Sequence, residues 1–260
     1  MDFIQKVKNL KLGKDELILG SWINTASPIV SEIMSASGFD FLCLDAEHSA
    51  LDYNNSLQLL QAIKAGNPNC FPLVRMQGNN YADTKRYLDA GALGVIAPLI
   101  NSKEEAERLV ESVYYPPRGN RGVGFGRSHA YGFNFNNYMD FANENLFVAI
   151  QVEHIDAVKN FEEIAKVKGI DAVFVGPYDL TASMGITAQF DDKNYLEILT
   201  YINEKCKEFG LISGIHVVQP SVDEVFSKYN MGYRMIAYSL DITIIGTYCR
   251  NAVSQIREKL

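Results

Sequence analysis

The chain has few cysteines, and they are not arranged as in a disulfide scaffold or a zinc site. Its 260 residues contain four, Cys43, Cys70, Cys206 and Cys249, and none of them forms a CxxC pair. This scarcity argues against a small secreted domain held by disulfides, and we expect a reduced, cytoplasmic protein. The first residues, "MDFIQKVKNLKLGKDE", are charged, helical in pattern and without the apolar core of a signal peptide.

Long apolar runs and basic clusters are also missing. No run approaches the ~20 apolar residues that a membrane span needs. The net charge is −7, from 24 basic and 31 acidic residues, whereas nucleic-acid binding needs a basic footprint. There is no GxSxG nucleophile motif, and "GVGFG" at 122–126 does not follow a strand and open a helix as a dinucleotide fingerprint does. We therefore expect small-molecule partners, with no nucleic acid and no membrane.

What the sequence does contain is a regular alternation of short apolar runs and helical patterns. Most runs are continuous in apolar character, as in parallel strands that are covered on both faces. The eight expected strands are 17–23, 39–45, 71–76, 94–100, 147–153, 171–177, 211–217 and 235–241. Between and after them lie helical patterns with start and stop signals, at 27–38, 52–66, 80–91, 102–115, 156–168, 193–209, 221–230 and 242–258.

Eight such pairs without a change of composition predict an α/β fold, a single-domain (β/α)₈ TIM barrel over residues 1–260. An open, doubly wound sheet is the alternative. One segment, 115–138, interrupts the alternation with a long loop that is rich in glycine, asparagine and aromatic residues. Loops of this length in compact domains are often lids, so we expect a long active-site loop there.

Ionisable side chains gather where the expected strands end. In a TIM barrel the catalytic groups lie at the carboxyl ends of the strands. The polar residues at these ends are Asp45, Glu47 and His48 after the second strand, Arg75 on the third, Gln151 and Glu153 on the fifth, Asp179 after the sixth, His216 on the seventh and Asp241 on the eighth. The sequence therefore predicts one polar site at the mouth of the barrel.

Glu153 and Asp179 form the most informative pair. Two carboxylates facing one cavity repel each other unless a cation stands between them. Mg²⁺ commonly takes one or two protein carboxylates and leaves its other positions to water and substrate. The pair therefore indicates a divalent metal site, and structural ion pairs with lysine or arginine are the alternative. No lysine lies in the expected strands, so Schiff-base chemistry fits less well.

Arg75 and His48 are the other candidates for chemistry. Arg75 could stabilise an enolate charge beside a keto oxygen, or form a salt bridge to Glu47 or Asp45. His48 suits proton transfer near neutral pH, and Asp89, in "YLDAG", could orient it.

The roles of the other histidines stay open in the sequence. His154 follows Glu153 directly and should point away from the site, because neighbours on an extended chain face opposite sides. His129 lies in the long loop, and His216 lies within a strand.

Several motifs in register resemble one known family. They are "LGSWIN", "GFDFLCLDAEHS", "PLVRM", "YLDAGALGVIAPLI", "YYPPRGNRGVG", "VAIQVE" and "GIDAVFVGPYDLTASMG", from about residue 17 to residue 190. The chain is similar to the 4-hydroxy-2-oxoheptanedioate aldolase family, class II pyruvate aldolases of the phosphoenolpyruvate-binding TIM barrels, which include the 2-keto-3-deoxy-sugar-acid aldolases. The resemblance implies reversible, metal-dependent cleavage of a 4-hydroxy-2-oxo acid to pyruvate and an aldehyde.

The resemblance also implies a role for each matching residue. It makes Glu153 and Asp179 the carboxylates that hold Mg²⁺, Mn²⁺ or Co²⁺. It makes His48 with Asp89 the acid–base pair and Arg75 the contact to the keto oxygen. The remaining matches are Asp45 and Glu47, which support the histidine or the metal's water, and Gln151, Gly176, Pro177, Tyr178 and Trp22, which surround the substrate.

The family's assembly and this chain's departures complete the expectations. The resemblance implies a homohexamer, a trimer of dimers, in which the last helix, 242–258 here, is exchanged between subunits. Ala46, Tyr178 and the ends of the last two strands depart from the family pattern, which leaves the aldehyde open. The polar loop at 125–138 favours a hydroxylated one. An acyl-CoA lyase, a 2-oxo-acid decarboxylase or a silent binding protein are the alternative functions.

Overall fold

In a computed structural model that describes residues 2–260, the eight strands close into one parallel barrel in sequence order, β1 to β8. Their bounds are β1 Ile18–Ile23, β2 Phe41–Asp45, β3 Phe71–Arg75, β4 Gly94–Ala97, β5 Phe147–Val152, β6 Ala172–Val175, β7 Ile212–Val217 and β8 Met235–Leu240. The predicted single-domain barrel is confirmed, and a closed barrel excludes the open sheet.

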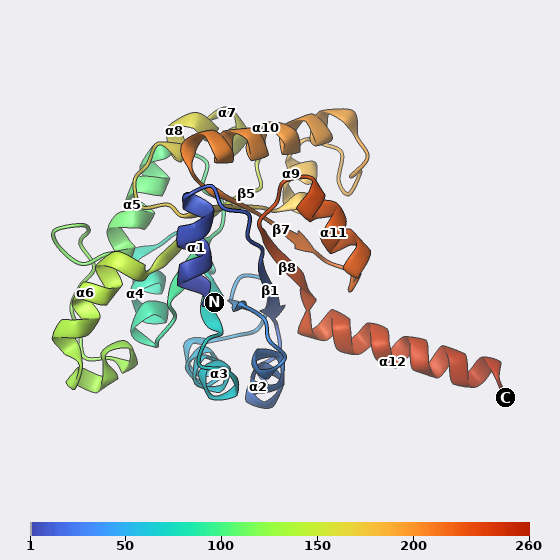
Figure 1. The fold of residues 1–260 in the computed structure, drawn as a ribbon, viewed down its shortest axis with the longest axis horizontal. Helices are drawn as coiled ribbons and strands as arrows, with labels where there is room; N and C mark the ends of the chain where they lie inside the picture. Colours follow the sequence, from blue (N-terminus) through green and yellow to red (C-terminus); the bar gives the residue numbers. More distant parts are fainter. Residues whose placement is uncertain (1) are drawn as a thin grey trace.

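Helices surround this barrel in the places that the capping signals indicate (Figure 1). Ser102, for example, caps its helix and forms a capping box with Glu105. The helices are α1 Phe3–Lys11, α2 Pro28–Ala36, α3 Tyr53–Gly66, α4 Tyr81–Asp89, α5 Lys103–Val113, η1 Arg127–Gly132, α6 Phe135–Asn145, α7 Ile155–Lys159, α8 Phe161–Ala165, α9 Pro177–Ser183, α10 Lys193–Phe209, α11 Val222–Asn230 and α12 Asp241–Glu258.

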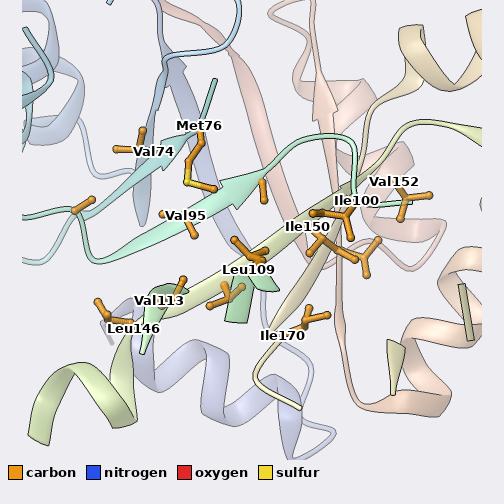
Figure 2. Close-up of a cluster of buried hydrophobic side chains, with 14 of the residues drawn as sticks. Val74, Met76, Val95, Ile100, Leu109, Val113, Leu146, Ile150, Val152 and Ile170 are labelled. Atoms are coloured by element: carbon orange, nitrogen blue, oxygen red, sulfur yellow. The ribbon is translucent and has the colours of Figure 1, made fainter. Parts of the chain in front are cut away.

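Two apolar cores follow from the alternation of side chains along each strand. Val74 and Val95 point outward and pack under the helices, whereas their neighbours Leu73 and Ile96 fill the barrel interior. Figure 2 shows part of the outer core, where Leu109 of α5 lies among side chains of β3, β4 and β5. Because both faces of the strands are covered, the continuous apolar runs of the sequence are accounted for.

One end of the barrel is closed by α1. Phe3 stacks on Phe71 with ring centroids 4.1 Å apart, and its edge meets Phe41 and Phe147. These phenylalanines begin or border the strands, so the amino-terminal end of the barrel is filled. Access to the interior is therefore from the carboxyl ends of the strands.

The segment 115–138 does not cover that open end. Tyr114 donates its hydroxyl hydrogen to the carbonyls of Leu146 and Gly169, at 3.2 and 3.3 Å, just before β5 and β6 begin. Arg127 donates to the carbonyl of Ala90, between α4 and β4. Arg127 thus lies near the amino-terminal ends of the strands, whereas the N–H of Gly122 donates to the Tyr81 hydroxyl at the start of α4, at 2.7 Å. The role of the loop at the active site stays a prediction.

The last helix, α12, leaves the body of the molecule (Figure 1). Only its first residue, Asp241, is buried, and it accepts hydrogen bonds from the backbone of Asn24 and Thr25 and from the Thr25 hydroxyl. The barrel therefore holds the start of α12 and leaves the rest uncovered. Among residues 2–260, no helix is long and apolar enough to cross a membrane.

Candidate active site

A cavity of about 470 Å³ opens at the carboxyl ends of the strands. Its lining brings together residues from almost every strand end, as the barrel geometry requires. The lining residues are Trp22, Asn24, Asp45, His48, Arg75, Gln151, Phe174, Val175, Gly176, Pro177, Tyr178, Asp179, His216, Val218, Leu240 and Ile242. Most of the predicted site residues therefore share one cavity.

The centre of the cavity wall is an ion pair between β2 and β3. Asp45 and Arg75 are register partners and face the interior. Arg75 donates from Nε and Nη2 to the two carboxylate oxygens of Asp45, at 3.0 and 2.7 Å, and its guanidinium lies 4.6 Å from the Trp22 ring. Burial raises the pKa of Asp45, but the hydrogen bonds and charge of Arg75 outweigh it, and the pKa is lowered. Asp45 therefore stays ionised and fixes Arg75.

The same carboxylate shapes the turn that carries Glu47 and His48. Its Oδ1 accepts the backbone N–H groups of Glu47 and His48, at 3.2 and 3.1 Å. Glu47 Oε2 then lies 3.3 Å from Arg75 Nε and 3.6 Å from His48 Nε2, and it is buried without a hydrogen-bond partner in residues 2–260. Burial, with the charges of Asp45 and Asp179, raises the pKa of Glu47 to about 7, although Arg75 opposes this.

Glu153 lies across the mouth and is held by two donors. Gln151 Nε2 donates to its Oε2 at 2.5 Å, and the backbone N–H of Leu99 donates to its Oε1 at 2.7 Å. Leu99 has φ = 53°, a strained conformation for leucine that aims its N–H at the carboxylate. Position 176 must be glycine, because a Cβ there would lie 2.8 Å from Glu153 Oε2. Burial raises the pKa of Glu153 to about 7, and the charges of Glu47 and Asp179 add to this.

Glu47, Glu153 and Asp179 form what we call the carboxylate cluster. Each of the two glutamates has its pKa raised in part by the charge of Asp179, so the charges of the three carboxylates interact. Gln151 Oε1 is buried beside them and has no hydrogen-bond partner in the described chain. A hard cation prefers such oxygen donors. Among residues 2–260, no set of three or more His, Cys, Asp or Glu side chains is placed so that it could hold an ion.

Asp89 is not part of this site within one chain. It ends α4, near the amino-terminal ends of the strands, and it accepts a 2.6 Å hydrogen bond from Arg121 Nη2. Arg121 is buried, and its guanidinium also faces the rings of Tyr115 and Tyr138. Within one chain Asp89 therefore does not contact His48, because helices of a barrel end opposite the mouth, and the pairing of Asp89 with His48 stays a prediction.

The remaining histidines divide between structure and site. His129 is buried in the loop; its Nδ1 accepts a hydrogen bond from the backbone N–H of Gly132, and its Nε2 lies within hydrogen-bond distance of the Gly124 carbonyl oxygen. His154 points away from the cavity, as expected, and caps α7 by accepting from the N–H of Asp156. His216 lines the cavity, with its Nε2 3.2 Å from the carbonyl oxygen of Ser239.

Some cavity residues did not emerge from the sequence reasoning. Asn24 donates from Nδ2 to Asp45 Oδ2 at 2.8 Å and so completes the partners of that carboxylate. Phe174 packs edge-on against Trp22, with centroids 5.7 Å apart, and forms the floor. Asn24 follows the end of β1 directly, and a polar residue in this position could have been predicted to line the cavity. Phe174 looked like ordinary core, because nothing in an apolar run marks the residue that borders a cavity.

A closed parallel barrel with polar side chains around a cavity at the carboxyl ends of its strands is the arrangement of TIM-barrel enzymes. Comparison with known proteins gives the family. The family model described as "HpcH/HpaI aldolase/citrate lyase" matches residues 19–245. The chain belongs to the HpcH/HpaI aldolase/citrate lyase family.

Individual relatives agree with this assignment. A hydroxypyruvate/pyruvate aldolase of Pseudomonas aeruginosa is 39% identical over 238 residues, which cover 90% of this chain and 87% of that protein. A 4-hydroxy-2-oxo-heptane-1,7-dioate aldolase of Shigella boydii is 32% identical, with coverage of 91% and 88%. The crystal structure of a family member from Burkholderia cenocepacia has a TM-score of 0.91 and 30% identity, with coverage of 98% and 99%. The motif-based resemblance and the expected class of enzyme, an aldolase-type lyase, are confirmed.

Proposed function

We propose that the protein reversibly cleaves a 4-hydroxy-2-oxo acid to pyruvate and an aldehyde with the help of a divalent metal ion. The observation that carries this proposal is the cavity that Arg75, Gln151 and Asp179 line together, with Glu153 hydrogen-bonded to Gln151 beside it. Glu153 and Asp179 would hold the ion, and Gln151 Oε1, which has no protein partner, faces the same place. Mg²⁺, Mn²⁺ or Co²⁺ bound there would supply Lewis-acid stabilisation of negative charge on the 2-oxo group.

The chain's own residues supply binding and proton transfer. Arg75 is held by Asp45 and presents its remaining positive edge to the oxygen that becomes negative when the C3–C4 bond breaks. His48 is exposed at the cavity edge, 3.6 Å from Glu47. It takes the proton from the 4-hydroxyl group in cleavage and returns it in addition.

The first turn of α9 binds the substrate carboxylate in this proposal. α9 begins at Pro177 with Gly176 as its cap, and the first N–H groups of a helix have no partner within it. The N–H groups of Tyr178 and Asp179 are in this position, and Trp22 forms the opposite wall. These contacts would hold the 2-oxo acid with its reacting carbons near Arg75 and His48.

Deuterium exchange at the methyl group of pyruvate tests the proposal without knowledge of the aldehyde. We expect exchange that is lost on chelation and restored by one of the three metals. Glu153→Gln should abolish exchange, whereas Glu163→Gln, which changes an exposed pair with Lys166, should not. Exchange that persists in folded, metal-free Glu153→Gln protein would refute the metal assignment.

We propose further that the active form is a homohexamer, a trimer of dimers, that exchanges α12. Exposed apolar residues lie along α12, among them Ile245 and Tyr248, with 48% and 78% of their surface exposed. Ile33 on α2 and Phe226 on α11, 61% and 59% exposed, are apolar as well. Exposed apolar surface of this extent marks an interaction site.

The buried thiols of Cys43, Cys70 and Cys206 suit the reducing cytoplasm in which we place the enzyme.

A further inference from the structure

A second pocket lies directly beside the catalytic cavity, and no step of the proposed reaction uses it. It has a volume of about 270 Å³. It shares part of its lining with the catalytic cavity, namely Pro177, Tyr178, His216 and Val218. Its own walls come from the α9–α10 connection, from α10, from β7 and the segment after it, and from α11. They are Phe190, Tyr195, Leu196, Leu199, Ile215, Gln219, Glu224 and Lys228. We call it the side pocket.

The walls of the side pocket are mostly aromatic and aliphatic. Tyr178 meets Phe190 edge-on at 5.0 Å between ring centroids, and Phe190 in turn lies 6.1 Å from Tyr195. Leu199 and Ile215 are buried behind them. The charged residues in the lining, Glu224 and Lys228, have opposite signs and add no net charge. Such a surface binds apolar groups and offers little to a polyhydroxylated chain.

His216 lies between the two pockets and lines both of them. Its ring lies 5.7 Å from the Trp22 ring, and burial lowers the pKa of His216 to about 4. The imidazole is therefore neutral at neutral pH. With Tyr178, which is 48% exposed, it marks the boundary where a ligand would pass from one pocket into the other.

We propose that the side pocket receives the aldehyde half of the substrate, and that this half carries an apolar group of about the size of a phenyl ring or a short aliphatic chain. The proposal rests on the aldolase function proposed above. A pocket of about 270 Å³ has room for such a group, since an engineered apolar cavity of about 150 Å³ binds benzene. Arg127 of the polar loop that favoured a hydroxylated aldehyde donates to the carbonyl of Ala90, at the other end of the barrel.

The test is aldol addition of pyruvate to phenylacetaldehyde and to glycolaldehyde by the metal-loaded enzyme. Leu196→Trp fills the side pocket from α10, where Leu196 is 42% exposed, so a larger side chain does not overpack the core. We expect kcat/KM for phenylacetaldehyde to fall about tenfold or more, because even one methylene in an apolar pocket is worth about 10–200-fold. The value for glycolaldehyde should change less than about twofold on the same argument.

Two further variants make the result specific. Phe190→Ala removes an aromatic wall and should raise KM for phenylacetaldehyde alone. Leu12→Trp adds the same bulk at a site that is 74% exposed at the end of α1, and it should change neither reaction. Equal effects of Leu196→Trp on both aldehydes, or a wild-type preference for glycolaldehyde, would overturn the assignment. Pyruvate methyl exchange, measured on every variant, separates these outcomes from failure of the aldolase function, since that failure abolishes exchange in wild type.

Discussion

The carboxylate cluster would make the proposed metal binding dependent on pH, and the size of this dependence follows from the pKa values of its two glutamates. Glu47 and Glu153 both have pKa values raised to about 7 in the metal-free protein. A protonated carboxyl group cannot serve as a metal ligand, so ions compete with protons for the cluster. Binding must therefore release protons, and the apparent affinity must rise as the pH rises through 7.

The magnitude follows from the ionised fraction. A group with a pKa of about 7 is roughly 90% protonated at pH 6, half protonated at pH 7 and roughly 10% protonated at pH 8. If only Glu153 must ionise, binding releases about 0.9 proton at pH 6 and about 0.1 at pH 8, and the apparent Kd rises up to about tenfold for each pH unit below 7. If Glu47 must ionise as well, the number of protons released at pH 6 doubles to about 1.8. The rise in apparent Kd is then up to about 100-fold for each pH unit below 7, because the two factors multiply.

Isothermal titration of Mn²⁺ into chelator-treated protein measures this directly. Titrations at pH 6, 7 and 8, each in two buffers of different ionisation enthalpy, give the number of protons released. Glu47→Gln separates the two cases, because it should lower the release at pH 6 to that of Glu153 alone. A Kd that does not change between pH 6 and 8, with no proton release, would refute the reasoning.

Three other predictions concern the residues around the cluster. Arg75→Met leaves Asp45 buried without its partner, so we expect a loss of about 3 kcal/mol, a fall in Tm of about 6–12 °C in calorimetry and loss of pyruvate exchange; an unchanged Tm would contradict the pairing. His216 has a folded pKa of about 4 against ~6.5 unfolded, so the unfolded state binds more protons, and the free energy of unfolding falls by up to about 3 kcal/mol as the pH drops from 7 to 4. Denaturant titrations between pH 4 and pH 7 should show a smaller dependence of this free energy on pH in His216→Phe. An unchanged dependence would refute the prediction. Ile245→Glu on α12 should dissociate the proposed hexamer in sedimentation velocity, and Lys259→Glu should not.

Much of the barrel and its mouth could be predicted from the sequence. Continuous apolar runs mark strands that are covered on both faces, and several of them, such as those that end in Asp45 and Arg75, end in a polar residue that lines the cavity. Asp45 and Arg75 could be paired in advance, because consecutive parallel strands lie side by side and both residues end their strands. The sequence suggested an ion pair of Arg75 with Asp45 or with Glu47, and the structure contains both ion pairs.

The positions of Asp89 and of the loop 115–138 within one chain follow from the direction of the helices. Strands and helices of a barrel run in opposite directions, so the end of a helix lies at the opposite end from the mouth. Asp89 ends α4, and the loop follows the end of α5. Both positions therefore belong to the amino-terminal ends of the strands, and the order of elements already contained that information. Whether Phe190 borders a pocket, in contrast, depends on the path of the α9–α10 connection, which no periodicity indicates.

The carboxylate cluster also implies a conflict between stability and function. One arginine faces Asp45 and Glu47 at the mouth, while Glu153 and Asp179 bring further negative charge. Because the folded pKa of Glu153 is raised to about 7, folding stability present below the unfolded pKa of ~4.5 is lost as the pH rises to 7, up to about 3 kcal/mol. A bound cation would offset this cost in the working enzyme.

Glu153→Gln should therefore stabilise the chelator-treated protein at pH 8 while it abolishes metal-dependent exchange. The amide keeps an oxygen for the N–H of Leu99 and removes the buried charge. We expect the gain, of order 1–3 kcal/mol, to disappear near pH 4.5, where the wild-type carboxyl group is protonated in the folded state. Glu163→Gln, with its exposed pair, should show no such gain. A Tm that falls in metal-free Glu153→Gln at pH 8 would mean that the carboxylate is satisfied by the protein itself, and the electrostatic argument for a metal at this site would lose its foundation.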